Sequence, residues 1–234
     1  MQVSVFGLDY VGSVAAGCLA SQGHEVIAVD PDADKVAMIR RAVAPVNEPG
    51  LSLLIKEAVG AQRLRATTDV AEAIAGSSLT SICSGTTDRH TRPDLSLILS
   101  LCEEIGVALR EKTKFHAIVL RSPVRPGTVR DFILPALERA SSKRVGVDFG
   151  IGIYPQFLRR GNAMEDYLNP PAIILGVTDD ETLARLRELD IALEAPEIVV
   201  ELDEAEAMLH ANLRSAAPAR SRPEPAWRAL PAMA

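Results

Sequence analysis

Two glycines and an acid near the start of the chain have the types and spacing of a dinucleotide-binding turn. Gly7 and Gly12 follow an apolar stretch at 2–6, and Asp30 closes a second apolar stretch at 25–29. In such a turn the first glycine permits a tight bend, the last lets a helix pack closely, and the helix N-terminus attracts a pyrophosphate. An acid after the second strand accepts hydrogen bonds from ribose hydroxyls, which favours NAD over NADP. We therefore predict an NAD site at these residues; glycines that serve packing alone are the alternative.

Asp9 stands where this turn normally has its middle glycine. A glycine there lets the backbone approach the pyrophosphate, whereas a side chain intrudes and a carboxylate repels the like charge. At about 4 Å the repulsion is ~1 kcal/mol in bulk water and up to ~4 kcal/mol at an effective dielectric near 20. The affinity should therefore fall by roughly tenfold to a thousandfold. The sequence predicts that Asp9 weakens NAD binding and that Asp9→Gly restores it.

The composition limits the classes of protein to which the chain can belong. Its 234 residues are 47% hydrophobic, enough for one good-sized core, and a net charge of −6 provides no basic surface for nucleic acid. The N-terminus lacks a signal-peptide pattern and no apolar run has membrane-spanning length, so we expect a cytoplasmic protein with no membrane partner. Cys18, Cys83 and Cys102 lack metal-ligand spacing and lie in apolar segments, which predicts reduced core residues and no metal site.

Strand-like apolar runs alternate with helical patterns along most of the chain. Strands are expected at 2–6, 25–29, 79–83, 115–120, 147–153, 172–176 and 197–200. Helices are expected near 11–22, 32–42, 51–59, 70–75, 95–111, 128–141 and 180–193. Near-continuous apolar runs, such as residues 117–120, are typical of strands covered on both faces. The pattern predicts an α/β fold, a doubly wound and mostly parallel Rossmann-like sheet over residues 1–201.

Polar residues predict how the later helices begin and where order ends. Thr178 with Glu181 has the spacing of a capping box, and Asp203 with Glu206 repeats it in acidic form before a last helical pattern at 202–213. Residues 214–234 are rich in Ala, Pro and Arg and have no periodicity. We expect this tail to be disordered because it cannot bury an apolar face.

Taken together, these motifs resemble the UDP-glucose/GDP-mannose 6-dehydrogenase family, and within it the GDP-mannose 6-dehydrogenases. The resemblance covers about residues 1–213 and is highly specific. Its stretches include Phe6-Gly7-Leu8, Tyr10-Val11-Gly12, Gly23-His24-Glu25-Val26-Ile27, Glu48-Pro49-Gly50-Leu51, Gly85-Thr86, Arg121-Ser122, Pro126-Gly127-Thr128 and Gly146-Val147-Asp148-Phe149-Gly150.

The resemblance implies an activity, a cofactor and a set of contact residues. Such enzymes oxidise the C6 alcohol of a nucleotide sugar to a carboxylate in two NAD-dependent steps, through a thioester on a cysteine. It places Tyr10, Val11, Asp30, Lys35 and Thr86 on the cofactor and Phe157, Leu158 and Arg159 on the substrate, and makes residues 202–213 the start of an inter-domain helix. Without the resemblance, Lys35 would be interpreted as a solvated charge on a helix.

Departures from the family pattern fall on the positions that carry catalysis. Pro123 stands where the family has a threonine that helps to order the catalytic water. Arg160 stands where the family has its acid/base glutamate, and an arginine cannot act as a base. The expected lysine and asparagine of the last helix align with His210 and Arg214, and the Gly-Gly-Ser-Cys segment with the nucleophile is absent. The three cysteines are not substitutes for it. We therefore expect a truncated dehydrogenase that is catalytically inactive.

Two other functions stay open at this point. One is a non-catalytic nucleotide-binding or regulatory module that pairs with a full-length dehydrogenase. The other is a different active dehydrogenase that uses its own histidines, of which His24, His90 and His116 precede the last helical pattern; core or surface roles are favoured for each. We also expect self-association through apolar surface that a longer relative would cover.

Overall fold

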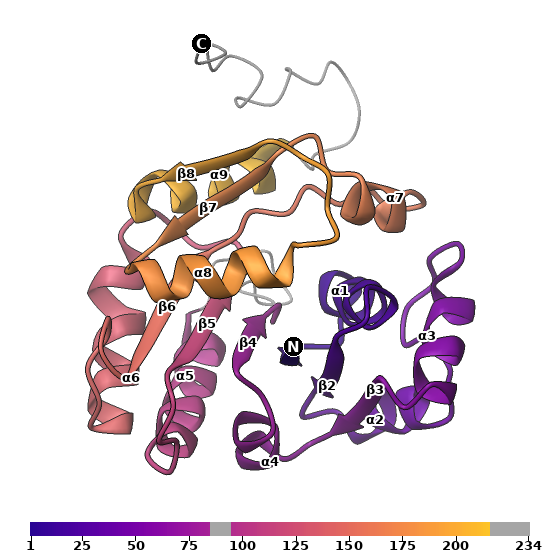
Figure 1. The fold of residues 1–234 in the computed structure, drawn as a ribbon, viewed down its shortest axis with the longest axis horizontal. Helices are drawn as coiled ribbons and strands as arrows, with labels where there is room; N and C mark the ends of the chain where they lie inside the picture. Colours follow the sequence, from indigo (N-terminus) through magenta and orange to yellow (C-terminus); the bar gives the residue numbers. More distant parts are fainter. Residues whose placement is uncertain (85–94, 216–234) are drawn as a thin grey trace.

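The computed structural model describes residues 1–84 and 95–215, and these form one eight-stranded sheet with helices on both faces (Figure 1). The strand order is β3-β2-β1-β4-β5-β6-β7-β8. All neighbouring strands pair in parallel except β6 and β7, which are antiparallel. The strands are β1 (Gln2–Phe6), β2 (Glu25–Val29), β3 (Leu64–Thr67), β4 (Leu79–Ile82), β5 (His116–Leu120), β6 (Phe149–Ile153), β7 (Ile173–Val177) and β8 (Glu197–Val200). The predicted doubly wound, mostly parallel fold is confirmed.

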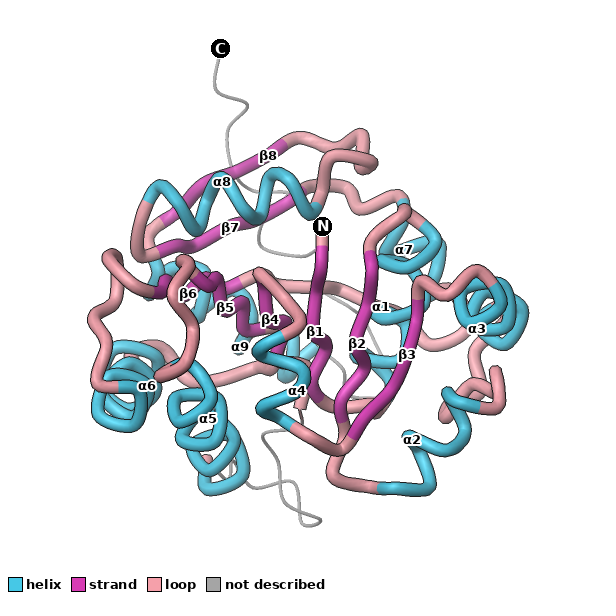
Figure 2. The backbone as a smooth tube through the Cα atoms, turned by 60° about the horizontal axis from the view of Figure 1, so that its bottom comes forward, coloured by secondary structure: helices cyan, strands magenta, loops and turns pink. Residues whose placement is uncertain are grey.

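Two apolar cores lie between the sheet and its helices. The core on one face includes side chains from α1 (Tyr10–Ser21), α2 (Ala33–Arg40), α3 (Leu51–Gly60), α7 (Ala163–Leu168) and α8 (Asp180–Leu189). The core on the other face includes side chains from α4 (Val70–Ala75), α5 (Ser96–Leu109), the π-helical turn η1 (Val129–Ile133), α6 (Leu134–Ser141) and α9 (Leu202–Ser215). Figures 1 and 2 both show α5 and α6 side by side on this second face. No described helix is long and apolar enough to cross a membrane.

The central strand β5 shows why its sequence is apolar without alternation. Ala117 and Val119 belong to the first core, whereas Ile118 and Leu120 belong to the second. All of β5 is buried, since successive side chains of a strand point to opposite faces and both faces are covered. Burial of the apolar area of a Val or Ile side chain stabilises the fold by about 1.5–3 kcal/mol.

Two elements were not predicted from the sequence. The strand β3 has four residues with an exposed Arg65 in its middle, so it shows no apolar run. The helix α7 has only six residues, includes Glu165 and Asp166 in its first turn, and has no capping hydrogen bond from the Asn162 side chain. Neither element shows the apolar run or the apolar periodicity by which the other elements were predicted.

The helix predicted over 128–141 is divided into two parts. Residues Val129–Ile133 form the π-helical turn, and α6 follows with Pro135 in its first turn. A proline has no amide hydrogen to donate to the preceding turn, and a π-helical turn is a common accommodation inside a helix.

The two predicted capping pairs are wrong. Asp179, not Thr178, caps α8, because its carboxylate accepts a hydrogen bond from the Thr182 amide at 2.8 Å. The Thr178 hydroxyl instead donates to the carbonyl of Ile151 on β6.

The capping pair predicted for α9, Asp203 with Glu206, does not form either. The helix already begins at Leu202, so Asp203 lies inside its first turn, where it pairs with Arg130. The carboxylate of Glu206 accepts from the amides of Gly127 and Val129, and therefore serves another segment. The last helix extends to Ser215, two residues beyond its predicted end, and the rest of the predicted disordered tail lies outside the described residues.

Candidate functional site

The order of the strands reverses beside β1, which pairs with β2 on one side and with β4 on the other (Figure 2). In open α/β sheets, ligands bind outside the carboxyl ends of the strands at such a switch point. Gly7 follows β1, and Cys83 and Ser84 follow β4, so these residues meet at that edge. The topology therefore places the glycine turn where a nucleotide site is expected.

Both glycines of the turn are required by the backbone geometry. Gly7 has φ of +92°, and a Cβ there would lie 2.8 Å from the Cα of Ser84. A Cβ on Gly12 would lie 1.7 Å from the carbonyl oxygen of Gly7. The first glycine makes the turn and the second lets α1 lie against it, as the sequence predicted. Val11 lies beside Gly12 in the first turn of α1 and is half-buried.

Asp30 is buried and holds the turn together. Its carboxylate accepts a hydrogen bond from the amide of Leu8 at 2.6 Å and another from the amide of Asp32 at 2.9 Å. Backbone donors fix the orientation of a carboxylate more firmly than mobile side chains do. The acid expected at a ribose is thus held at the start of α1.

Lys35 forms an ion pair with Asp9. Its ammonium lies 2.7 Å from the carboxylate of Asp9 and 3.4 Å from that of Asp30. Burial acts to lower the pKa of Lys35, but the hydrogen bond to Asp9 and the charge of Asp30 outweigh it and raise that pKa. Lys35 is therefore an ion-paired and partly buried residue at the glycine turn.

The side chain of Asp9 does not cap the helix that it precedes. It makes no capping hydrogen bond to α1 and is mostly exposed, with its carboxylate turned to Lys35. The first amides of α1 consequently receive no side-chain acceptor from Asp9, and they retain the positive end of the helix dipole. The position of Asp9 opposes an anion, whereas the helix itself attracts one.

Tyr10 connects the start of α1 with the loop that precedes α7. Its hydroxyl donates to the carboxylate of Glu48 at 2.6 Å, and the guanidinium of Arg160 lies 4.7 Å from the centre of its ring. Burial, with the hydrogen bond to Glu48 and its charge, raises the pKa of Tyr10. The tyrosine is therefore held in place as a neutral donor.

The predicted substrate residues lie on the same loop. Phe157 and Leu158 are half-buried, and Leu158 packs against the first core. Arg159 is exposed but forms an ion pair with Asp166 at 2.5 Å, and its carbonyl lies 3.4 Å from the hydroxyl of Tyr10. The structure thus brings the loop of predicted substrate residues beside the glycine turn. Thr86, the remaining predicted cofactor residue, lies outside the described residues.

The thiols of the described chain are core groups. Cys18, Cys83 and Cys102 are all buried. Burial raises the pKa of Cys18 and of Cys102 to about 12, and it raises that of Cys83 as well. Since the thiolate is the nucleophile, these side chains are inert at neutral pH. The prediction that they are core residues is confirmed.

The two described histidines of the sheet domain are also core residues. His116 bonds to the hydroxyl of Thr80 at 2.8 Å, and burial together with the charge of Lys112 lowers its pKa to about 3. His24 is buried against the carbonyl of Leu189. His90 lies outside the described residues. The described residues include no cluster of side chains that could hold a metal ion.

Sequence reasoning missed two buried charged residues beside the site. Glu48 belongs to the matched stretch Glu48-Pro49-Gly50-Leu51, which was the available signal. Arg121 is 2% exposed, and its guanidinium lies 4.2 Å from the ring centre of Tyr154 and 5.5 Å from that of Tyr167. Within the described chain no hydrogen-bond acceptor faces its three nitrogens, so the two rings and the nearby Asp190 stabilise its charge.

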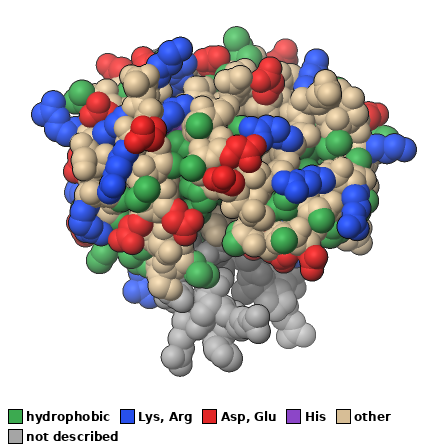
Figure 3. All heavy atoms as spheres, turned by 90° about the horizontal axis from the view of Figure 1, so that it is seen from below, with side chains coloured by type: hydrophobic (Ala, Val, Ile, Leu, Met, Phe, Trp, Pro, Cys, Tyr) green, Lys and Arg blue, Asp and Glu red, His purple; other side chains and the backbone are tan. Residues whose placement is uncertain are grey.

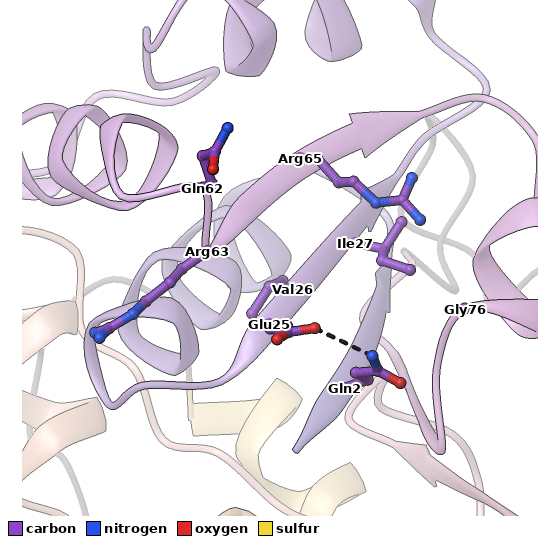
Figure 4. Close-up of a pocket in the computed structure, with 8 residues that line it drawn as sticks. All are labelled: Gln2, Glu25, Val26, Ile27, Gln62, Arg63, Arg65 and Gly76. Atoms are coloured by element: carbon purple, nitrogen blue, oxygen red, sulfur yellow. Dashed lines mark hydrogen bonds between the residues drawn. The ribbon is translucent and has the colours of Figure 1, made fainter.

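A pocket of about 250 Å³ lies at the opposite edge of the sheet (Figure 4). It is lined by the amino ends of β1, β2 and β3 and by Gly76. Polar side chains of the lining are already paired: Gln2 bonds to Glu25 within the pocket, and Arg65 bonds to the neighbouring Glu72. Because it lies at the amino ends of the strands, this pocket is not the site beside the glycine turn.

On the face of the molecule seen in Figure 3, basic and acidic side chains are interspersed.

Comparisons with known proteins decide the family. Residues 1–192 match the NAD binding domain of the UDP-glucose/GDP-mannose dehydrogenase family. The chain belongs to this family. A GDP-mannose 6-dehydrogenase of Pseudomonas putida is 45% identical over 208 residues, which are 88% of this chain and 47% of that protein. A UDP-glucose 6-dehydrogenase of Haloferax volcanii is 37% identical over 218 residues, 91% of this chain and 50% of that protein.

Solved structures of the dehydrogenase family agree with this assignment. A ternary complex of GDP-mannose dehydrogenase from Pseudomonas aeruginosa matches with a TM-score of 0.89 and 42% identity, covering 93% of this chain and 50% of that chain. A UDP-glucose dehydrogenase from Pyrobaculum islandicum matches with a TM-score of 0.84 and 32% identity, covering 90% of this chain and 48% of that chain. The chain spans about half the length of the dehydrogenases it matches, the half that includes the NAD binding domain.

Proposed function

We propose that this chain is the NAD-binding part of a nucleotide-sugar 6-dehydrogenase, with a GDP- or UDP-linked sugar as the associated substrate class. The observation that carries the proposal is the glycine turn between β1 and α1. Gly12 leaves no room for a Cβ, and Asp30 is fixed by backbone amides at the end of β2. These residues fit a dinucleotide: the start of α1 would hold the pyrophosphate, and Asp30 would accept a ribose hydroxyl.

The affinity for NAD is reduced by Asp9. Its carboxylate precedes the first turn of α1, where a pyrophosphate would sit, and it also takes the ammonium of Lys35 away from the ligand. The ion pair screens part of the repulsion but leaves the side chain in place. We therefore expect a loss of affinity at the lower end of the roughly tenfold to thousandfold range.

We propose that the described chain has no dehydrogenase turnover of its own. Arg160 occupies the position of the expected acid/base, and its guanidinium stays charged over the ring of Tyr10. Pro123 has no hydroxyl with which to order a water. The three cysteines are buried and protonated, so no nucleophile is available among the described residues. A regulatory module that pairs with a full-length dehydrogenase remains the alternative role.

Two assays test these proposals together. Calorimetry with NAD and NADP on the whole chain should show weak binding of NAD and still weaker binding of NADP, because Asp30 would repel a 2′-phosphate. An NADH-absorbance assay with GDP-mannose and with UDP-glucose should show no turnover. A turnover of about 1–100 per second, the range of ordinary enzymes, would contradict the inactive assignment.

We further propose that the chain associates with itself through the β8 edge. Among the described strands β8 ends the sheet on that side, and Val199 is 47% exposed there. An unpaired edge strand can pair with its copy across a twofold axis, which makes the contact self-complementary. Light scattering at increasing concentration should show dimers, and Val199→Lys should reduce them. A monomer at all concentrations would refute the contact.

A further inference from the structure

Glu48 is a buried carboxylate, 5% exposed, in the segment between α2 and α3. It accepts hydrogen bonds from the hydroxyl of Tyr10 at 2.6 Å, the amide of Gly161 at 2.9 Å and the amide of Ala163 at 2.8 Å. Tyr10 belongs to the cofactor turn, whereas Gly161 and Ala163 follow directly on the substrate loop. We propose that Glu48 is a positioning residue that couples these two segments, so that a dinucleotide bound at the turn orders the substrate loop. This inference rests on the proposed function.

The geometry makes the three contacts depend on one another. Oε2 of Glu48 accepts from both Tyr10 and Gly161, and Oε1 accepts from Ala163, so a rotation of the carboxylate disturbs both segments. Burial acts to raise the pKa of Glu48, but its three hydrogen bonds outweigh this and lower the pKa, which keeps the group ionised at neutral pH. Hydrogen bonds to a charged acceptor are about twice as strong as neutral ones. The carboxylate is therefore a firm link.

Further contacts join Tyr10 to the same loop. The Tyr10 hydroxyl lies 3.4 Å from the carbonyl of Arg159, and the guanidinium of Arg160 lies over the Tyr10 ring. Contacts along the segment 159–163 thus converge on the first residue of α1. A displacement of Tyr10 by a bound dinucleotide is transmitted to this segment through the carboxylate and through the ring.

A carboxylate at the opposite edge of the sheet provides a matched control. Asp179 accepts from the hydroxyl of Thr182 at 2.9 Å and from the amide of Thr182 at 2.8 Å, so it also combines a hydroxyl donor with a helix N-terminus. Its carboxylate lies against Gly150, which pairs with Ala117 near the amino end of β5. Asp179→Asn therefore imitates the chemical change of Glu48→Gln without touching the cofactor turn.

The first experiment needs no ligand. Amide hydrogen exchange of Gly161 and Ala163 is measured in the full chain, in Tyr10→Phe and in Asp179→Asn. Loss of the Tyr10 hydroxyl frees the carboxylate to rotate, so Tyr10→Phe should speed exchange at both amides about tenfold, within the usual range of coupling between sites. Asp179→Asn should leave both rates unchanged. Equal rates in the full chain and in Tyr10→Phe would overturn the inference.

The second experiment uses NAD as the probe, in the Asp9→Gly background where binding is strongest. NAD should slow exchange at Gly161 and Ala163, and Glu48→Gln should abolish this slowing and weaken NAD binding about tenfold, because coupling is reciprocal. Asp179→Asn should change neither readout. The same NAD-dependent slowing in Glu48→Gln, or its loss in Asp179→Asn, would refute the coupling. Absence of NAD binding by Asp9→Gly would refute the proposed function, and the first experiment would still decide the role of Glu48.

Discussion

The ammonium of Lys35 lies 2.7 Å from the carboxylate of Asp9, which directly precedes helix α1 at the proposed nucleotide site. This contact pairs Asp9, whose charge opposes the binding of an anion, with Lys35, whose charge favours it. The aspartate therefore acts in two ways, because it adds a negative charge beside α1 and withdraws a positive one. The predictions for cofactor binding follow from this pair.

The Asp9–Lys35 pair should contribute little to the stability of the fold. Asp9 is 66% exposed, and exposed ion pairs typically contribute between about 0 and 1 kcal/mol. Lys35→Ala should therefore lower the free energy of unfolding by less than about 1 kcal/mol, measured by denaturant titration. In calorimetry it should weaken NAD binding more strongly in the Asp9→Gly background, where Lys35 is free to contact the ligand. An equal loss in both backgrounds would show that the pair has no part in binding.

Gly12 should tolerate no side chain. The Cβ of Gly12→Ala would lie 1.7 Å from the carbonyl oxygen of Gly7, so α1 must shift away from the turn. We expect a loss of about 3 kcal/mol in the free energy of unfolding, at the upper end of overpacking effects. Gly60→Ala is the control, because nothing lies within 4 Å of its Cβ and it ends a helix. That variant should be neutral or slightly more stable, by up to about 1 kcal/mol. Similar losses in both variants would refute the assignment.

Asp190 should make the stability depend on pH. Burial raises its pKa to about 6, against the opposing charge of Arg121. Between pH 4 and pH 6 the unfolded chain has lost this proton while the folded chain retains it, so stability from this group falls as the pH rises. Asp190→Asn removes this titration. The free energy of unfolding of the variant minus that of the natural chain should therefore increase by on the order of 2–3 kcal/mol between pH 4 and pH 7. A difference that stays constant over this window, by denaturant titration, would contradict the shift.

Much of the fold could be predicted because its signals are local. The apolar run of β5 reports burial on both faces, Gly7 reports a backbone that needs φ above zero, and Gly12 reports the close approach of α1 to the turn. The strand β3 and the helix α7 gave no such signal, because Arg65 interrupts the apolar run of β3, and α7 has two acids in its first turn and no side-chain cap. The wrong caps have a similar cause, since Thr178 and Glu206 bond to segments distant in sequence.

The candidate site shows the same division between local and distant information. Gly7, Gly12 and Asp30 could be identified from their spacing alone. The partners of Asp9 and Tyr10 could not, because Lys35 lies 26 residues away in the sequence and Glu48 lies 38 residues away. Such pairs form only when the sheet brings α2 and the following segment to the start of α1. Their roles therefore become visible in the structure alone.

The most direct test of the central claim is a calorimetric titration of NAD into the natural chain and into Asp9→Gly. If the turn is a nucleotide site weakened by this aspartate, Asp9→Gly should bind NAD at least about tenfold more tightly than the natural chain. Micromolar affinity in the natural chain, unchanged by the substitution, would contradict the account.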